Sequence, residues 1–391
     1  MTQRGAHVGL NVVMIATYPL EPGRIVGGIE SVTSTLVPAL AARDEIDTLT
    51  VLRFHNGEAP VHTRREGPKV EIRYLRGQSR LGVATGSYLD VRQARKIIAE
   101  LAPDVVHAQE IGVRGDIATQ ISRNTIVTVH GLVHLETKLQ ARASIKERVR
   151  YYLVEAMVRR VLRRAKVVIS ISDYDAKALT GLVRGEHISI PNPTAPEFFA
   201  LAPSAETEPR LLFAGVLSPR KNPEGLLTAF ALAVQQVPKA RLIMVGPQPD
   251  PGYARTIREH ATALGLDEHI EFTGMVDNDR LREEIAAARA VVLFSQEETS
   301  PTILAQAMAA GNPVISSRVG GIPEMVTEGE NGYLVAPDDV TAFAARMVEL
   351  LENQELALDL GRRGHAKALE KFEPDAVARR TVETYLRVAG M

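Results

Sequence analysis

The sequence predicts an α/β protein with two doubly wound domains, each built on a parallel sheet with helices on both faces. Three observations support this prediction. The chain has 391 residues, more than the roughly 250–300 that one hydrophobic core usually serves. Short runs rich in β-branched residues alternate with longer helical patterns, which is the order of βαβ units. Five prolines between residues 191 and 210 interrupt the alternation, as is typical of a linker, so we place the domain boundary at residues 192 and 193.

Composition narrows the class of protein. Hydrophobic residues make up 45% of the chain and charged residues 24%, values close to those of globular proteins, which excludes a disordered or collagen-like chain. The chain has no cysteine, so disulfides, thiolate metal sites and cysteine nucleophiles are excluded. We therefore expect a cytoplasmic protein.

The net charge of −1 conceals two halves of opposite charge. Residues 1–192 carry 27 Lys and Arg against 19 Asp and Glu, which gives +8 and leaves −9 for the rest of the chain. Such asymmetry fits a basic half that meets an anionic partner, or two lobes that attract one another across a cleft.

In the first domain, β-branched runs predict parallel strands at residues 8–15, 49–54, 70–75, 105–108, 126–129 and 167–171. Gly27 and Gly28 follow the first run and precede an apolar-periodic helix over residues 31–40. Paired glycines before a helix let backbone N–H groups approach a phosphate, but they also form plain turns. His130 follows the fifth run directly. It is therefore expected at the carboxyl edge of the sheet, either as a donor or base or as a surface residue.

A basic amphipathic stretch covers residues 141–166. Its nine Lys and Arg residues stand at 142, 146, 148, 150, 159, 160, 163, 164 and 166, against Glu147 and Glu155. Such a helix can bind the anionic face of a membrane, or it can pack its apolar side on the core and leave its charges in water. Both interpretations stay open, while nucleic-acid binding has no recognisable motif.

In the second domain, apolar runs predict strands at residues 210–214, 242–245, 270–273, 290–294 and 314–316. Gly215 ends the first run, and Arg220 and Lys221 follow in a turn where two cations can neutralise a diphosphate or simply face solvent. An acidic loop follows the fourth run and leads into a helix marked by Ser300-Pro301 at its start. There Glu298 can accept hydrogen bonds from sugar hydroxyls, and backbone N–H groups of residues 299–302 can cap a phosphate.

Other site classes find no support in the sequence. G-x-G-x-x-G, the P-loop motif and H-E-x-x-H are all absent. Two Asp-x-Asp pairs, Asp173/Asp175 and Asp277/Asp279, fall where a strand passes into a helix. Capping of the helix N-termini explains them better than a divalent metal does, so we expect no metal site.

The order of these motifs resembles family 4 retaining glycosyltransferases of the GT-B fold. The resemblance spans essentially the whole chain and rests on Gly27-Gly28, His130-Gly131, Gly215 with Lys221, Glu298 eight residues before Gln306, and Val319-Gly320-Gly321-Ile322-Pro323-Glu324. It implies two Rossmann-like domains that face one another across a cleft. The acceptor domain would comprise residues 1–192 plus 373–391, because the last helix returns to it, and the donor domain residues 193–372.

The resemblance also implies an activity and its residues. A sugar would pass from a UDP- or GDP-type nucleotide sugar to a lipid-linked, saccharide or small-molecule acceptor, with retained anomeric configuration and without a metal or cofactor. His130, Lys221 and Glu298 would be catalytic. Donor binding would involve Gly27, Gly28, Gly215, Arg220, Lys221, Glu298, Thr299, Ser300, Pro301, Thr302 and Gln306.

Two positions depart from the family pattern. Val216 stands where the family usually has Arg, and Gln306 where it has a second Glu. Arg220 can replace the missing Arg from another place on the turn. Gln306 can still accept hydrogen bonds from ribose hydroxyls, although more weakly than a carboxylate.

Retention is expected to proceed by front-face transfer, as proposed for the family. Glu298 has no clear second carboxylate for double displacement, so the leaving diphosphate would help accept the acceptor's proton while Lys221 stabilises its charge. Two alternatives stay open: a sugar-nucleotide epimerase or hydrolase of the same fold, and a non-catalytic donor-binding subunit. The expected partners are the donor, the acceptor and, through residues 141–166, the anionic inner face of a membrane.

Overall fold

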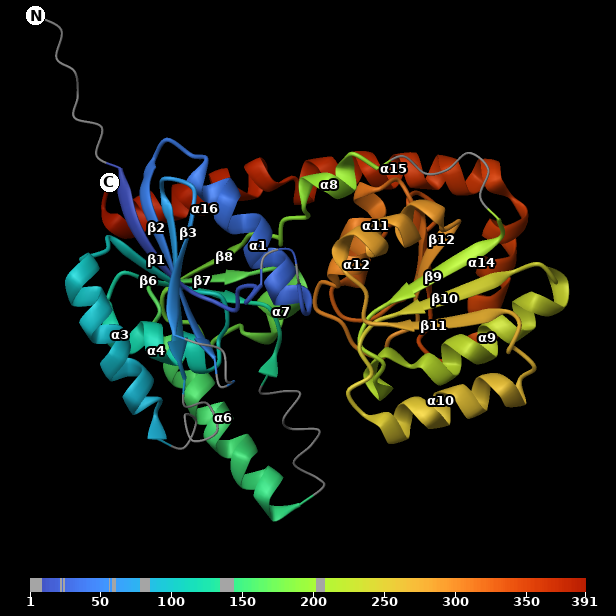
Figure 1. The fold of residues 1–391 in the computed structure, drawn as a ribbon, viewed down its shortest axis with the longest axis horizontal. Helices are drawn as coiled ribbons and strands as arrows, with labels where there is room; N and C mark the ends of the chain where they lie inside the picture. Colours follow the sequence, from blue (N-terminus) through green and yellow to red (C-terminus); the bar gives the residue numbers. More distant parts are fainter. Residues whose placement is uncertain are drawn as a thin grey trace, which may run out of the picture. The chain divides into compact units, whose positions relative to one another are not determined.

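The computed structural model describes residues 9–21, 23, 25–55, 57, 61–77, 85–133, 144–201 and 208–391. Residue 8 of the first expected strand and residues 141–143 of the basic stretch lie outside this described part. The chain forms two compact units (Figure 1). Residues 26–193 and 374–391 belong to the first unit, together with the first strand, and residues 194–373 form the second.

The first unit is built on one sheet with the strand order β3-β4-β2-β1-β5-β6-β7-β8. Its strands are β1 (Leu10–Ile15), β2 (Ile46–His55), β3 (His62–Glu66), β4 (Val70–Arg76), β5 (Val105–Ala108), β6 (Thr125–Val129), β7 (Val167–Ser170) and β8 (Glu186–Ser189). Neighbouring strands are parallel, with the exception of β3, which pairs antiparallel with β4. The predicted doubly wound parallel sheet is therefore confirmed, with one antiparallel strand added at its edge.

Helices cover both faces of the first sheet (Figure 1). On one face lie α1 (Gly28–Ala41) and α16 (Pro374–Ala389), and on the other α3 (Tyr88–Leu101), α4 (Val113–Ile121) and α6 (Ile145–Arg164). Side chains of β1 alternate between the two cores, because successive residues of a strand point to opposite faces. Met14 packs with the α1 and α16 side, whereas Val13 and Ile15 pack with the α3, α4 and α6 side.

The second unit has a wholly parallel sheet in the described part, with the order β11-β10-β9-β12-β13-β14. Its strands are β9 (Arg210–Ala214), β10 (Arg241–Val245), β11 (Ile270–Gly274), β12 (Ala290–Leu293), β13 (Val314–Ser317) and β14 (Gly332–Val335). Its helices are α8 (Pro196–Phe199), α9 (Pro223–Gln236), α10 (Pro251–Ala263), α11 (Asn278–Ala287), α12 (Thr302–Ala309), α13 (Ile322–Met325), α14 (Val340–Glu352) and α15 (Gln354–Phe372). One continuous hydrophobic core joins these elements.

Each sheet has a point where the strand order reverses direction. In the first sheet this point lies between β1 and β5, and in the second between β9 and β12. Helices that follow two such strands depart to opposite faces, so a crevice forms beyond the carboxyl ends, and ligands of open α/β sheets bind there. These two places are where functional side chains should be sought.

The two Asp-x-Asp pairs cap helices, as the sequence analysis expected. Ser172 and Asp175 form a reciprocal capping box at α7 (Asp173–Ala178). Asp277 accepts a hydrogen bond from the Arg280 backbone at the start of α11, at 2.8 Å. Both carboxylates satisfy N–H groups that have no partner within their helix.

Candidate active site

The second unit brings Lys221 and Glu298 together at its topological switch point. Lys221 ends a short 3₁₀ turn (Pro219–Lys221) that follows β9, and Glu298 lies in the loop after β12. Because β9 and β12 are parallel neighbours, their following loops meet at one edge of the sheet. The two loops are also joined through their backbones, since Gln296 N–H donates to the Arg220 carbonyl at 2.8 Å.

The Glu298 carboxylate is the centre of a polar cluster. One oxygen forms an ion pair with Lys221 Nζ and accepts a hydrogen bond from the Ser295 hydroxyl at 2.8 Å. The other oxygen accepts a longer bond of 3.3 Å from Arg220, whose guanidinium also donates to the Glu297 carbonyl at 2.9 Å. The sequence therefore located three members of this cluster, and Ser295 is the member it missed.

Lys221 and Glu298 are both removed from solvent, with 8% and 5% of their surfaces exposed. Burial lowers the pKa of the Lys221 ammonium, and the Glu298 carboxylate opposes that shift. A buried ion pair contributes little net stability because desolvating two charges offsets their attraction. An anion that enters beside Lys221 would instead meet a cation already held in place, as binding of a diphosphate requires.

Glycines let the backbone of this edge pass close to other groups. Gly320 has φ +52°, and a Cβ atom there would lie 1.7 Å from the Glu298 carbonyl oxygen. The neighbouring Gly321 N–H donates to that same carbonyl at 3.0 Å. Gly215 lies against the stem of Lys221, since a Cβ there would meet Lys221 Cε at 3.5 Å. These approaches fix the loop that carries Glu298.

Helix α12 and the loop before it carry the remaining expected donor-binding residues of the second unit. Pro301 is its N-cap residue, Thr302 is its first residue, and Thr299 and Ser300 precede it. Gln306 lies in the same helix and is 8% exposed. Val216, in place of the family's Arg, is 39% exposed and brings no charge to this edge.

His130 belongs to the first unit, at the carboxyl end of β6. Its Nε2 lies 2.8 Å from the Oε1 of Gln109, the residue that follows β5. In this orientation the amide oxygen can only accept, so Nε2 carries the proton and Nδ1 keeps the lone pair. Burial, together with the positive charge of Arg114, lowers the pKa of His130 to about 4, and Asn192 opposes the shift. The imidazole is therefore neutral at physiological pH.

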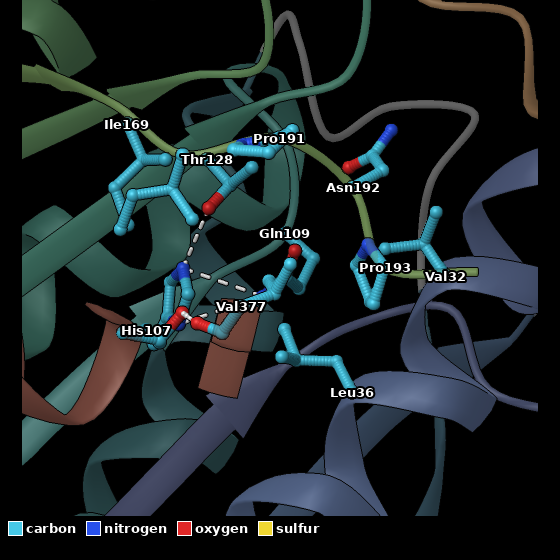
Figure 2. A pocket seen from close by; sticks show the side chains of 12 residues that line it. Val32, Leu36, His107, Gln109, Thr128, Ile169, Pro191, Asn192, Pro193 and Val377 are labelled. Atoms are coloured by element: carbon cyan, nitrogen blue, oxygen red, sulfur yellow. Dashed lines mark hydrogen bonds between the residues drawn. The ribbon is translucent and has the colours of Figure 1, made fainter. Parts of the chain in front are cut away.

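A second histidine, His107, lies beside Gln109 (Figure 2). Its Nε2 lies 2.7 Å from the Thr128 hydroxyl. Its Nδ1 lies 2.7 Å from the hydroxyl of Tyr385 in α16. The Gln109 amide nitrogen lies 3.3 Å from His107 Nε2. Burial lowers the pKa of His107 to about 3, so this ring too is neutral. The sequence pattern predicts a functional role for His130 but not for Gln109, His107 or Tyr385.

Gly27 and Gly28 begin α1 after the β1 switch point. Gly27 is the N-cap residue with φ +94°, a conformation that favours glycine. The Glu30 carboxylate lies at this helix start, where it accepts a hydrogen bond from the Val26 N–H at 2.8 Å and pairs with Arg53 at 3.1 Å. A carboxylate of the chain thus already occupies part of the positive end of the helix.

Two family models match consecutive parts of the chain. Residues 26–197 match the model described as Glycosyltransferase Family 4, and residues 195–367 match Glycosyl transferases group 1. Curated relatives include the N-acetyl-alpha-D-glucosaminyl L-malate synthase of Bacillus anthracis, 32% identical over 173 residues. A D-inositol 3-phosphate glycosyltransferase of Streptomyces avermitilis is 31% identical over 180 residues. Each match covers 44% of this chain, and 44% and 39% of the two relatives, less than half of their lengths.

Solved structures resemble the chain over nearly its full length. Sucrose-phosphate synthase from Thermosynechococcus elongatus has a TM-score of 0.82 at 23% identity, covering 97% of this chain and 99% of its own. HepE of Anabaena, solved in complex with UDP, has a TM-score of 0.71 at 20% identity, covering 96% and 99%. At these identities the likeness shows the fold.

Proposed function

The chain belongs to the family 4 glycosyltransferases and has the GT-B fold, and from this we propose that it transfers a sugar from a UDP- or GDP-type nucleotide sugar to an acceptor hydroxyl, with retained anomeric configuration. The observation that carries the proposal is the buried Lys221–Glu298 pair at the switch point of the second sheet. Two adjacent loops carry the pair: Lys221 supplies a cation for a diphosphate, and Glu298 supplies oxygen atoms that can accept hydrogen bonds from sugar hydroxyls. Structural neighbours solved with UDP and UDP-glucose support the same class of donor.

In this mechanism Lys221 stabilises the charge that develops on the leaving diphosphate. Burial makes the interaction stronger than it would be in water, because the local dielectric constant is lower. When the donor binds, the Glu298 carboxylate accepts hydrogen bonds from hydroxyls of the transferred sugar in place of part of its interaction with Lys221. Arg220, which is half exposed beside it, supplies a second cation in place of the charge that Val216 lacks.

His130 and the α1 start serve the transferred sugar, the phosphate or the acceptor. The neutral imidazole offers Nδ1 as a hydrogen-bond acceptor for a hydroxyl, since Gln109 holds the proton on Nε2. No metal or cofactor is required in this proposal, because the cations of the chain neutralise the diphosphate. The acceptor is a saccharide, a lipid-linked molecule or a small molecule, and the two relatives above are named for small hydroxyl-bearing anions.

We also propose that α6 places the protein on an anionic membrane surface. The first half of α6 exposes Ile145, Val149, Tyr152 and Leu153, which are 41–72% exposed. They share one side of the helix and are flanked by Lys146, Arg148 and Arg150, the composition of an interfacial helix. None of the described helices is long and apolar enough to cross a bilayer.

A nucleotide-sugar panel with one matched pair of variants tests the transfer reaction. Wild type should release UDP or GDP from a donor only when an acceptor is present, and NMR of the product should show the retained anomer. Lys221→Ala should lower kcat/KM by roughly 30- to 1,000-fold, because one charge-assisted contact in the transition state contributes about 2–4 kcal/mol. Lys239→Ala, at an exposed lysine of the same unit, is the control and should leave the rate unchanged.

The same assay separates the alternatives. Consumption of donor without an acceptor would identify a hydrolase or epimerase. Donor binding without turnover would identify a binding subunit. Full activity in EDTA is expected, and loss of activity that Mg²⁺ restores would reject the metal-independent mechanism.

A further inference from the structure

Helices α3, α4 and α6 cover one face of the first sheet (Figure 1). Residues of these helices and of the segment before α3 line a basic groove. It has a volume of about 620 Å³, within the range of small-molecule sites. Gln120 and Tyr88 also line it. The Gln120 amide donates to the Gly86 carbonyl at 3.1 Å, and Tyr88 is 63% exposed. Five cations line it, namely Arg92, Arg95, Lys96, Arg160 and Arg164.

Most of the charge in this groove is not neutralised. Arg160 pairs with the buried Asp116 at 2.9 Å. None of the other four has an ion-pair partner among the residues that the structure describes; Arg95 donates to the Gln120 carbonyl instead. Elsewhere on α6 the arginines are paired: Arg150 with Glu147, and Arg159 with Glu155. Two helices thus bring four uncompensated charges into one concavity, an arrangement that is unfavourable until an anion enters.

Two residues of the groove, Gln120 and Arg164, lie away from the edge that carries His130. Helix α4 leads from the carboxyl end of β5 to the start of β6, and Gln120 is near its end. Arg164 ends α6 and stands just before β7. Both residues therefore lie toward the amino edge of the sheet, while His130 follows the carboxyl end of β6. A five-residue strand separates the two edges by roughly 13–17 Å at about 3.3 Å per residue.

We propose that this groove is a second binding site, for a ligand that carries two closely spaced phosphate groups. Each phosphate monoester carries about −1.5 to −2 charge at neutral pH, so two of them match the four uncompensated cations. Arginine suits such a ligand because its planar fork binds phosphate oxygens in pairs. The phosphates belong either to a water-soluble bisphosphorylated molecule or to lipid headgroups beside the exposed side of α6. Binding here would hold a ligand away from the reacting sugar.

Titration with inorganic pyrophosphate tests the groove, with binding followed by calorimetry. The groove variant is Arg92→Gln/Lys96→Gln/Arg164→Gln, three exposed positions whose change should not disturb the core. The control is Lys239→Gln/Arg241→Gln/Arg255→Gln, which removes the same charge from exposed positions of the second unit. Lys221→Ala serves as background in all proteins, so that pyrophosphate bound at the proposed donor site does not contribute.

In that background the control should bind pyrophosphate, and the groove variant should bind it at least about tenfold more weakly. A second arm uses phosphatidylcholine vesicles with and without phosphatidylinositol bisphosphate, a lipid whose headgroup carries two phosphate monoesters. If the groove variant alone loses binding to these vesicles and free pyrophosphate does not bind, the phosphates are those of a lipid. Equal binding by the groove variant and the control in both arms overturns the proposal. Because binding is measured without turnover, the result does not depend on the proposed transferase activity.

Discussion

At the scale of single residues, His107 and His130 of the first unit are held neutral by their surroundings. Thr128 and Tyr385 satisfy His107, and Gln109 orients His130. Burial is the largest cause of both lowered pKa values. A neutral His130 with its proton on Nε2 can accept a hydrogen bond through Nδ1, which an imidazolium cannot do.

The first prediction concerns stability against pH. The unfolded chain binds protons at these histidines near pH 6.5, whereas the folded chain binds them only near pH 3 to 4. The free energy of unfolding should therefore fall as the pH drops from about 6.5 toward 4, by up to about 1.4 kcal/mol per pH unit for each histidine. His107→Gln should remove one histidine's share of that slope. Urea unfolding at several pH values between 5 and 7 measures it, and identical slopes for the two proteins would contradict the assignment.

Only some of the side-chain contacts at the candidate site could be predicted from the sequence. Lys221 and Glu298 follow two predicted strands, β9 and β12, that are neighbours in the sheet. Because the carboxyl ends of parallel neighbours lie at one edge, the sequence could predict that these two residues are close together. His107 stands inside a run that was predicted as a strand, and its partner Tyr385 lies 278 positions along the chain. Strand periodicity carries no information on such a pairing. A histidine in an otherwise apolar buried strand was the one available signal.

At the scale of elements, the loop that carries Glu298 depends on a glycine. Gly320→Ala should destabilise the protein and also lower transfer activity, because its Cβ would overlap the Glu298 carbonyl. Gly329→Ala is the matched control, since Gly329 also has a positive φ of +72° but has nothing within 4 Å of the added Cβ. The control should lose only about 1–2 kcal/mol of stability from backbone strain. Thermal unfolding and kcat/KM are measured for both, and equal activities would show that the contact is unimportant.

Helix α6 divides into two halves with different surroundings. From Val154 onward the helix buries Val154, Met157, Val158, Val161 and Leu162, so the core-packing interpretation of the basic stretch is confirmed for these residues. Its first half exposes the apolar side described above. The sequence does not show where along α6 the apolar side chains pass from exposed to buried, because both halves carry similar basic and apolar residues.

A vesicle experiment tests the exposed half. Wild type should co-sediment with vesicles that contain phosphatidylglycerol at low salt and detach near 1 M salt, where screening shortens the reach of charges to about 3 Å. Val149→Ser/Tyr152→Ser/Leu153→Ser should weaken binding roughly 100-fold at about 1 kcal/mol for each apolar side chain lost. Met275→Ser/Leu369→Ser, at exposed apolar residues of the second unit, should bind as wild type. Absence of wild-type binding at low salt would reject the membrane proposal.

Three short strands were not predicted from the sequence. β3 and β8 are polar edge strands that bury little surface, so their sequences lack the apolar runs that predict a buried strand. β14 is different, because its four residues are all buried. The central strands, which are buried on both faces, were found to within a few residues of their ends.

At the scale of the whole molecule, α16 completes the core of the first unit. Val377, Ala378, Val382, Tyr385 and Val388 are at most 2% exposed and pack in the same core as β1 and α1. Lys166 also donates to the Val388 carbonyl at 2.7 Å. Fully buried apolar side chains contribute about 1.5–3 kcal/mol each, so their sum is comparable to the total stability of a domain, about 5–15 kcal/mol.

Truncation after Glu373 should therefore unfold the first unit and spare the second. Limited proteolysis of the shortened chain is expected to leave a resistant fragment that begins near residue 194 and to degrade the rest. Removal of Gly390 and Met391 alone is the control and should leave the full pattern, because neither belongs to a core cluster. A first unit that resists proteolysis without α16 would show that the helix is dispensable for folding.

The return of the chain to its first unit also sets an order of events during translation. The ribosome must synthesise residues 194–373 before it reaches α16, which takes roughly 10–40 s at about 5–20 residues per second. During that interval the sheet face that α16 later covers is exposed on the nascent chain. At the end of that interval the second unit is completely synthesised, whereas the first unit still lacks α16. The second unit can therefore fold first, although most of it follows the first unit in the sequence. The first unit should accordingly be the part that chaperones bind while the polypeptide is still attached to the ribosome.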